Sequence, residues 1–158
     1  MIKVQRDPFD MGEELSSFSQ DNHSIGGVCA FMGQVRDMAE DASVSAMTLE
    51  HYPGMTEKAL EKIEAEAHER WELEKTLIIH RYGRLDAGDP IVLVVVASAH
   101  RAAAFDACRF LMDWLKTQAP FWKQEETDKG PQWVVARQSD DEAASRWGDV
   151  PANAPESS

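Results

Sequence analysis

Apolar and polar residues follow both strand and helical spacing along this chain, so the sequence predicts a mixture of the two elements. Residues 26–36 and 43–52 are β-prone segments separated by the polar stretch DMAEDA, which predicts a strand pair joined by a loop. Apolar residues at helical intervals predict an amphipathic helix over about 55–71. Asp10, three residues before Glu13, resembles a capping box and predicts a short first helix.

The second half of the chain carries the strongest pattern. The segments KTLIIHRYG (75–83) and PIVLVVVASA (90–99) flank the turn-rich RLDAGD, which predicts an antiparallel hairpin whose nearly all-apolar second strand is central in its sheet. A buried helix is predicted directly afterwards, over 100–118, ended by Pro120. Its apolar stripe is Ala104, Phe105, Cys108, Leu111, Met112 and Leu115.

The end of the chain is less regular. PQWVVARQ (131–138) predicts a last short strand, and a loosely held tail rich in Asp, Ala, Pro and Ser follows. Strand pairs mixed with helices of uneven spacing favour the α+β class. We therefore expect a single domain over 1–147 and a flexible tail over 148–158.

Composition and charge narrow the function classes. The 158 residues, 43% of them hydrophobic, fit one compact domain. The formal net charge of −12 argues against a general nucleic-acid binder, so any anion site must be local. No stretch approaches the ~20 apolar residues that span a bilayer, and a cytoplasmic protein is expected. Cys29 and Cys108 are far apart in sequence and form no metal-spaced cluster, which predicts buried free thiols in a reducing compartment.

The junction ASAHRAAAF places His100 and Arg101 where a buried strand passes into a helix N-terminus. Positive side chains oppose the helix dipole there, by ~0.3–1 kcal/mol each when exposed, unless an anion lies between them and the free backbone N–H groups. The alternative is that Arg101 pairs with a carboxylate and His100 is structural. Spacing alone leaves the two interpretations equal.

The stretch LKTQAPFWKQE places Lys116 and Lys123 on either side of an aromatic run. Helical geometry puts Lys116 about 80° from the centre of the apolar stripe, at the border of the core. By itself this fits a lysine that keeps its ammonium in water, and Lys123 beside Trp122 fits a cation–π contact. Since the helix is ~24 Å long, Lys116 and the His100 end can share a site only through another segment or a second subunit.

Other candidates are weaker. Arg36 ends a predicted strand beside a loop, a common place for a binding residue. His80 and Arg81 are expected to close a strand edge. The sequence has no HExxH, GxSxG, P-loop or dinucleotide fingerprint, so metal hydrolysis, serine esterase chemistry and nucleotide binding are unsupported.

Taken in order, the motifs FMGQVR, LEHYPGM, HRYGRLDAGD, SAHRAAAFDAC, LKTQAPFWKQE and WVVARQSDDEAASRW resemble the MoaE family, the large subunits of molybdopterin synthase. The resemblance runs from about residue 2 to Trp147. It implies an α/β hammerhead fold and a sulfurtransferase that makes the dithiolene of molybdopterin from cyclic pyranopterin monophosphate. The sulfur donor is the C-terminal glycine thiocarboxylate of a small ubiquitin-like subunit. The family also implies a homodimer of large subunits within a heterotetramer, with no cofactor and no metal.

Matched position by position, the resemblance implies a substrate pocket and two catalytic lysines. Lys116 is expected to act beside the thiocarboxylate, and Lys123 as electrostatic partner or acid. Arg36, His100 and Arg101 suit the substrate phosphate. The full set of expected binding residues is Gln34, Val35, Arg36, His100, Arg101, Lys116, Lys123, Gln124 and Glu125.

The chain departs from the family pattern in the loop after Arg36, which reads DMAEDAS where many relatives carry an Asn and a Gly, and at Gln34, where another residue is common. Two other functions remain open. One is a non-catalytic docking module for a ubiquitin-like tail. The other is a lysine Schiff-base enzyme, which would need one deeply buried lysine.

Overall fold

A computed structural model describes residues 1–39, 42–133 and 145–148, in which helices and strands are mixed as the α+β class predicts. The helices are α1 (Met11–Phe18), α2 (Met55–Arg70) and α3 (Arg101–Thr117). The strands are β1 (Ile2–Gln5), β2 (Gly27–Gln34), β3 (Met38–Ala39), β4 (Ala42–His51), β5 (Lys75–Arg81), β6 (Gly83–Asp86), β7 (Pro90–Ser98), β8 (Phe121–Thr127) and β9 (Gly130–Trp133).

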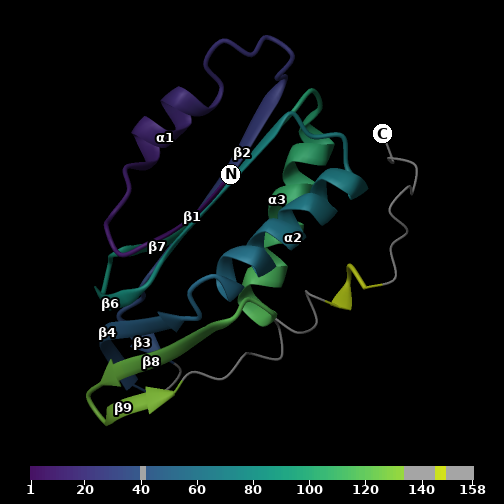
Figure 1. Cartoon of the computed structure of the whole chain (residues 1–158). Helices are drawn as coiled ribbons and strands as arrows, with labels where there is room; N and C mark the ends of the chain where they lie inside the picture. The colour runs from purple at the N-terminus through teal and green to yellow at the C-terminus, as the bar shows by residue number, and fades with distance from the viewer. Residues whose placement is uncertain (40–41, 134–144, 149–158) are drawn as a thin grey trace.

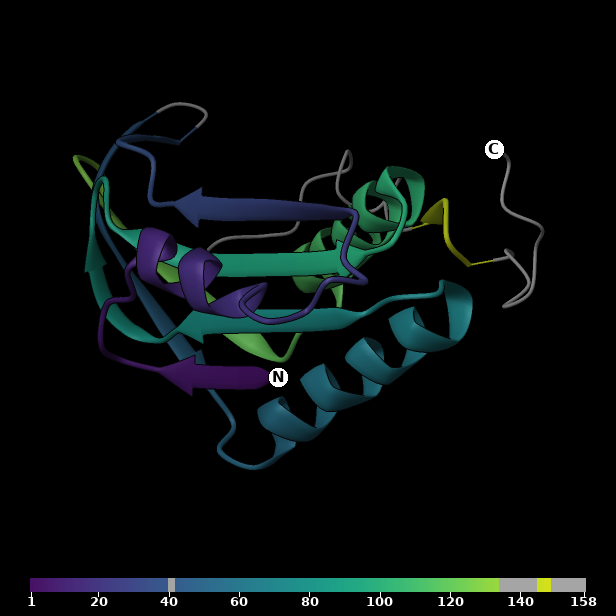
Figure 2. The ribbon, with the colours of Figure 1, turned by 90° about the horizontal axis from the view of Figure 1, so that it is seen from above.

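Four strands form the main sheet, in the order β1-β5-β7-β2. Figure 2 shows them side by side. The predicted hairpin is confirmed, because β5 and β7 pair antiparallel, and β7 lies inside the sheet as its apolar run indicated. The sequence pattern missed β1, which is four residues long and pairs parallel to β5.

The main sheet has helices on both faces, as Figure 1 shows, with α1 on one side and α2 and α3 on the other. Because side chains alternate along a strand, β7 contributes to two cores. Val92, Val94 and Val96 pack with the residues of α2 and α3, whereas Leu93, Val95 and Ala97 pack with Phe18 of α1. Burial on both faces explains why this strand is almost entirely apolar.

A second sheet lies at one end of the first. Its strands follow the order β3-β4-β8-β9, and β6 also pairs with β4. The predicted pairing of 26–36 with 43–52 is wrong, because β2 pairs with β7 and β4 pairs with β3, β6 and β8. The strands themselves were predicted correctly, but long-range partners are not fixed by local sequence.

Helix boundaries follow the local signals closely. The Asp10 side chain accepts a hydrogen bond of 2.9 Å from the backbone N–H of Glu13, so Asp10 caps α1 as predicted. The stripe of α3 is buried except for Phe105, which is 62% exposed and corrects the prediction. Phe105 lies at the border of the stripe, and none of the described helices or strands covers it.

The segment after α3 differs from its predicted form. Gln118 caps α3, and β8 begins at Phe121, so the Pro-Phe-Trp run leads straight into a strand instead of forming a separate turn. The predicted strand 131–138 is seen up to Trp133. Residues 134–138 and most of the predicted tail, 149–158, lie outside the described residues. Among the described helices, none is long and apolar enough to cross a membrane.

Candidate functional site

A cavity of about 360 Å³ lies where the two sheets meet α3. The main sheet, the loop after β2, helix α3 and strand β8 all contribute to its walls. The lining residues are Phe31, Met32, Gly33, Gln34, Arg36, His80, Ile91, Val92, Met112, Leu115, Lys116 and Lys123. Apolar and cationic side chains therefore surround one space.

Four of the predicted site residues meet in this cavity: Gln34, Arg36, Lys116 and Lys123. Lys116 stands beside buried Leu115 on α3, which confirms its place at the border of the core. Its side chain is nevertheless exposed in the single chain, so the partial desolvation expected for it is not provided by this subunit alone. Lys123 reaches the same space from β8, which the sequence pattern did not predict as a strand.

Val35 does not line the cavity. Its side chain is 3% exposed and packs in the small core of the second sheet. Its backbone is held at both ends, since its N–H donates to Asp89 and its carbonyl accepts from Gly88. Val35 thus fixes the point from which Arg36 extends.

Gln124 and Glu125 follow Lys123 along β8 and pair with β4 at Thr48 and Met47. Neither lines the cavity. Because side chains alternate along a strand, Glu125 shares the face of Lys123 and Gln124 has the opposite one.

His80 is the site residue that the sequence pattern missed. It lies on β5, is 4% exposed, and lines the cavity with Lys116 and Lys123. The pKa of His80 is lowered from 6.5 to about 3, mainly by burial and also by the nearby charges of Lys123 and Lys116, against the opposing effect of a hydrogen bond to the Arg81 backbone.

The tautomer of His80 follows from that hydrogen bond. Its Nδ1 lies 2.9 Å from the carbonyl oxygen of Arg81, and a carbonyl only accepts, so Nδ1 carries the proton and Nε2 does not. No local sequence pattern indicates this role. The burial of the ring depends on stacking against Phe121, a residue 41 positions away in a different sheet.

His100 and Arg101 lie at the other end of α3 and do not line the cavity. Both are exposed, and in the described part of the chain neither side chain makes a hydrogen bond or an ion pair. Among the described residues, the structural alternative, in which Arg101 pairs with a carboxylate, is therefore not seen. Gly26 approaches this junction so closely that a Cβ there would lie 2.0 Å from the carbonyl oxygen of Ala99.

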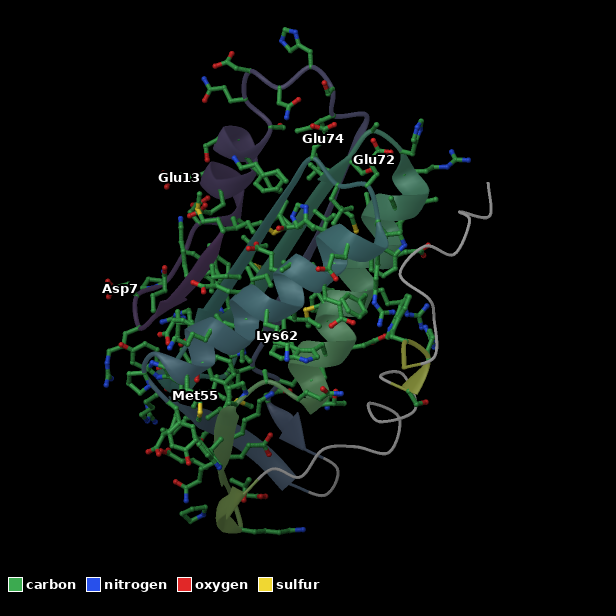
Figure 3. All side chains as sticks on the ribbon, turned by 45° about the vertical axis from the view of Figure 1, so that its right-hand side comes forward. Asp7, Glu13, Met55, Lys62, Glu72 and Glu74 are labelled. Carbon is green, nitrogen blue, oxygen red and sulfur yellow. The ribbon has the colours of Figure 1, made fainter. Side chains whose placement is uncertain are left out.

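The cationic cavity contrasts with the rest of the surface. The side chains labelled in Figure 3 include Asp7, Glu13, Glu72 and Glu74, which project into solvent from the outer parts of the molecule. In a chain of net charge −12, Arg36, Lys116 and Lys123 place three cationic side chains around one space, which is the arrangement expected of a local anion site. The arrangement can hold an anionic substrate against an apolar wall.

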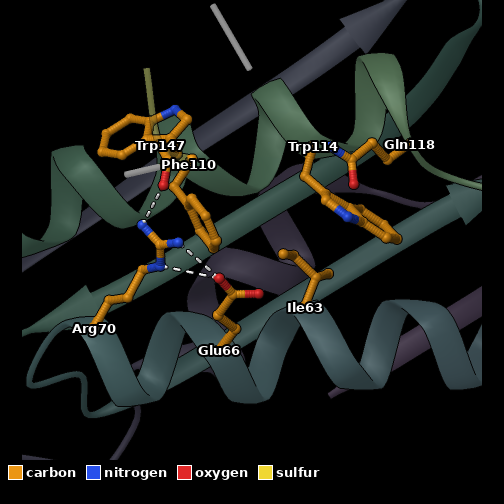
Figure 4. A pocket seen from close by; sticks show the side chains of 8 residues that line it. Ile63, Glu66, Arg70, Phe110, Trp114, Gln118 and Trp147 are labelled. Carbon is orange, nitrogen blue, oxygen red and sulfur yellow. Dashed lines mark hydrogen bonds and ion pairs between the residues drawn. The ribbon is translucent and has the colours of Figure 1, made fainter. Parts of the chain in front are cut away.

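A second cavity, of about 210 Å³, lies between α2, α3 and Trp147 (Figure 4). Arg70 donates to Glu66 and to the backbone carbonyl of Trp147, and Trp147 donates through Nε1 to Asp113 at 2.6 Å. The ring of Trp147 also packs edge-on against Phe110. These contacts anchor the chain near its C-terminal end and give this cavity a structural role.

His, Cys, Asp and Glu are the side chains that commonly bind metal ions. Among the described residues, no group of three or more His, Cys, Asp and Glu side chains is placed to hold a metal ion. Both cysteines are free thiols, with Cys108 buried and Cys29 partly buried.

Comparison with known proteins gives a consistent result. The profile of the MoaE protein family matches residues 4–118. A molybdopterin synthase catalytic subunit of Pseudomonas aeruginosa is 58% identical over 146 residues, covering 92% of this chain and 97% of that protein. A solved molybdopterin biosynthesis MoaE protein from Burkholderia ambifaria is 51% identical with a TM-score of 0.79, covering 94% and 97% of the two chains. The molybdopterin synthase structure from Staphylococcus aureus is 31% identical with a TM-score of 0.76, covering 84% and 96%.

Proposed function

This chain belongs to the MoaE family, and we propose that it is the catalytic large subunit of a molybdopterin synthase. In this role it transfers sulfur from the C-terminal thiocarboxylate of a small ubiquitin-like subunit to cyclic pyranopterin monophosphate, which forms the dithiolene of molybdopterin. The observation that carries the proposal is the meeting of Arg36, Lys116 and Lys123 around one cavity in an otherwise acidic protein. Both reactants are anions, and each needs positive charge at the point of transfer.

The residues that line the cavity have different roles in the proposed reaction. Lys116 acts beside the glycine thiocarboxylate, where it stabilises the charge of the acyl intermediate or moves a proton as sulfur attacks. Lys123 supplies a second positive charge from β8. His80, which stays uncharged, lines the same cavity without adding to the repulsion between the two lysines.

The small-subunit tail enters along the apolar side of the cavity. At Gly33 a Cβ would lie 2.8 Å from Cγ1 of Val92, so the wall is already closely packed there. A glycine terminus, which has no side chain to place, suits an approach along this closely packed wall. An entering tail also displaces water from Lys116, which is exposed in the single chain.

His100 and Arg101, the expected phosphate-binding residues at the far end of α3, reach the cavity through a homodimer. In the described part of the chain β2 pairs only with β7, so β2 is an edge strand, and α3 packs beside it. Phe31 and Phe105 on this edge are 45% and 62% exposed. A twofold axis perpendicular to α3 places the α3 helices of the two copies antiparallel, which brings His100 and Arg101 of one copy to the Lys116 end of the other.

The proposed synthase role also includes a set of binding residues, a domain extent and an assembly. The binding set comprises Gln34, Val35, Arg36, His100, Arg101, Lys116, Lys123, Gln124 and Glu125, with Val35 acting through its backbone. The domain extends over 1–147, supported by the anchoring of Trp147 on α2 and α3. The homodimer binds two small subunits in a heterotetramer in the cytoplasm.

Reconstitution tests the proposal. Purified chain, thiocarboxylated small subunit and cyclic pyranopterin monophosphate are combined, and dithiolene-containing pterin is measured. We expect product with the wild-type chain and a loss of at least about 100-fold in rate for Lys116→Ala. Absence of product with a competent donor contradicts the proposal and leaves a docking module. Full rate in Lys116→Ala contradicts only the role of that lysine.

A further inference from the structure

The imidazole ring of His80 presents one nitrogen, Nε2, to the proposed catalytic cavity. The ring lines this cavity, and its Nδ1–H donates to the backbone carbonyl of Arg81. In the described part of the chain this is the ring's only hydrogen bond. No described side-chain nitrogen or oxygen is both enclosed and without a partner, so Nε2 is not sealed inside the core. It therefore faces the cavity.

The ring is held in place before any ligand binds. Phe121 stacks on it with the ring centroids 3.8 Å apart, and the Nδ1 bond to Arg81 fixes its rotation. Because burial lowers the pKa of His80 to about 3, Nε2 is unprotonated at neutral pH and only accepts hydrogen bonds. Nε2 is thus a preorganised acceptor, which costs little ordering entropy when a ligand binds.

Hydrogen-bond acceptors are scarce among the described side chains that line this cavity. The other polar side chains there are Gln34, Arg36, Lys116 and Lys123. The arginine and the two lysines only donate when charged, and the amide of Gln34 can donate or accept. Phosphate and thiocarboxylate groups are acceptors and cannot use Nε2. The ligand of Nε2 must therefore carry an N–H or O–H donor.

We propose that Nε2 of His80 accepts a hydrogen bond from an N–H group of the substrate's pterin ring. This assignment rests on the proposed synthase function, whose substrate joins an anionic phosphate to a pterin with several N–H donors. The cations of the cavity hold the anionic groups, and His80 recognises the ring. His80 thereby distinguishes a pterin phosphate from other phosphates of the same charge.

A lysine ammonium is the other kind of donor near Nε2. Lys116 lines the same cavity, but its side chain is exposed and makes no hydrogen bond among the described residues. The two donors have different consequences. A bond to the pterin contributes to substrate affinity, whereas a bond to a catalytic lysine contributes to the rate of the chemical step.

Substrate binding to the full-length chain, in complex with the small subunit lacking its thiocarboxylate sulfur, tests the proposal without turnover. Equilibrium dialysis measures the dissociation constants of cyclic pyranopterin monophosphate and of inorganic phosphate. His80→Phe keeps a stacking ring but removes Nε2. We expect its dissociation constant for the pterin to rise about tenfold and that for phosphate to stay unchanged. His80→Gln offers an amide oxygen instead and should bind the pterin within about threefold of wild type.

Two further variants are matched controls. His23→Phe makes the same replacement at an exposed position and should keep both dissociation constants. Arg36→Ala removes a cation from the cavity and should raise both of them. Circular dichroism and the thermal midpoint identify the folded variants. His80→Leu, which also removes Nε2, takes the place of His80→Phe if that variant does not fold.

Equal pterin affinity in wild type and folded His80→Phe overturns the proposal. A parallel loss of phosphate affinity overturns it too, because His80 would then only maintain the shape of the cavity. An equal loss of pterin affinity in folded His80→Gln has the same meaning. Unchanged affinity with a slower single turnover assigns Nε2 to a lysine instead. All four outcomes differ from failure of the proposed function, in which wild type with a thiocarboxylated donor gives no product.

Discussion

His80 of β5 and Phe121 of β8 stack with their ring centroids 3.8 Å apart and their planes 16° apart. Since β5 belongs to the main sheet and β8 to the second sheet, this contact joins the two sheets beside the cavity. Lys123 is two residues beyond Phe121 and shares its face of the strand. The stacked pair therefore fixes where Lys123 stands relative to Lys116 on α3.

His80 is expected to make stability depend on pH. Its folded pKa of about 3 is below the unfolded value of 6.5, so the unfolded chain binds the extra proton between these values. The contribution is complete above pH 6.5 and is lost as the pH falls toward 3, with a slope of about 1.4 kcal/mol per pH unit. Replacing His80 by Phe should remove this slope from the free energy of unfolding, measured by urea denaturation between pH 4 and 8.

His23 provides the matched comparison, because it is exposed. His23→Phe should keep the wild-type pH dependence within error. Equal slopes for wild type and His80→Phe would show that His80 becomes charged without cost, contrary to its burial.

The two lysines should differ in their tolerance of arginine. Lys123 is proposed to supply charge, so Lys123→Arg should retain activity within about tenfold. Lys116 is proposed to act at the thiocarboxylate itself, so Lys116→Arg should lose at least about 100-fold. Single-turnover assays of the reconstituted synthase measure both rates. Similar losses in the two variants would mean that the roles are shared, and a larger loss for Lys123→Arg would mean that they are reversed.

Inactive chains should complement each other if the proposed dimer is correct. Lys116→Ala and Arg101→Ala damage opposite ends of α3, so a mixed dimer has one intact site composed of both chains. Random pairing makes half of the dimers mixed, and co-expression should restore about a quarter of wild-type activity.

Co-expression of Lys116→Ala with Lys123→Ala is the control for this complementation. Both lysines line one cavity within a chain, so every site in the mixed dimer has a defect and activity should stay low. Restoration in the control, or none in the test pair, would contradict the proposed shared site.

Trp147 is expected to contribute to stability rather than to turnover. Trp147→Ala removes its hydrogen bond to Asp113 and its aromatic packing on Phe110 and Trp71, which should lower the free energy of unfolding by about 2–4 kcal/mol. Trp147→Phe keeps the packing and should cost about 1 kcal/mol. The rate per folded active site should be unchanged. A large fall in that rate would connect the second cavity to catalysis.

The sequence predicted those elements whose signal is local. The apolar run of β7 and the stripe of α3 identify a central strand and a buried helix without reference to partners. In β8 the signal is absent, because FWKQEET is mostly half-buried and carries charges that its partners accommodate. Strand β6 is hidden in the same way within a stretch rich in turn residues.

The residues of the candidate site likewise differ in whether a local sequence signal identifies them. Lys116 could be placed at the core border from helical geometry, and the family motifs identified Arg36 and Lys123 beside it. His80 could not be found, because its neutral state depends on burial by a segment distant in the sequence. The distance between Lys116 and His100 was correctly derived from helix length alone, since helical rise is constant.

The length of α3 also limits how the sequence can change. One inserted residue would turn every later side chain by about 100° and move Lys116 off its wall, while a full inserted turn would shift it by about 5.4 Å toward β8. In the proposed dimer the same change would displace both halves of each site at once. Insertions and deletions should therefore be excluded between Arg101 and Thr117.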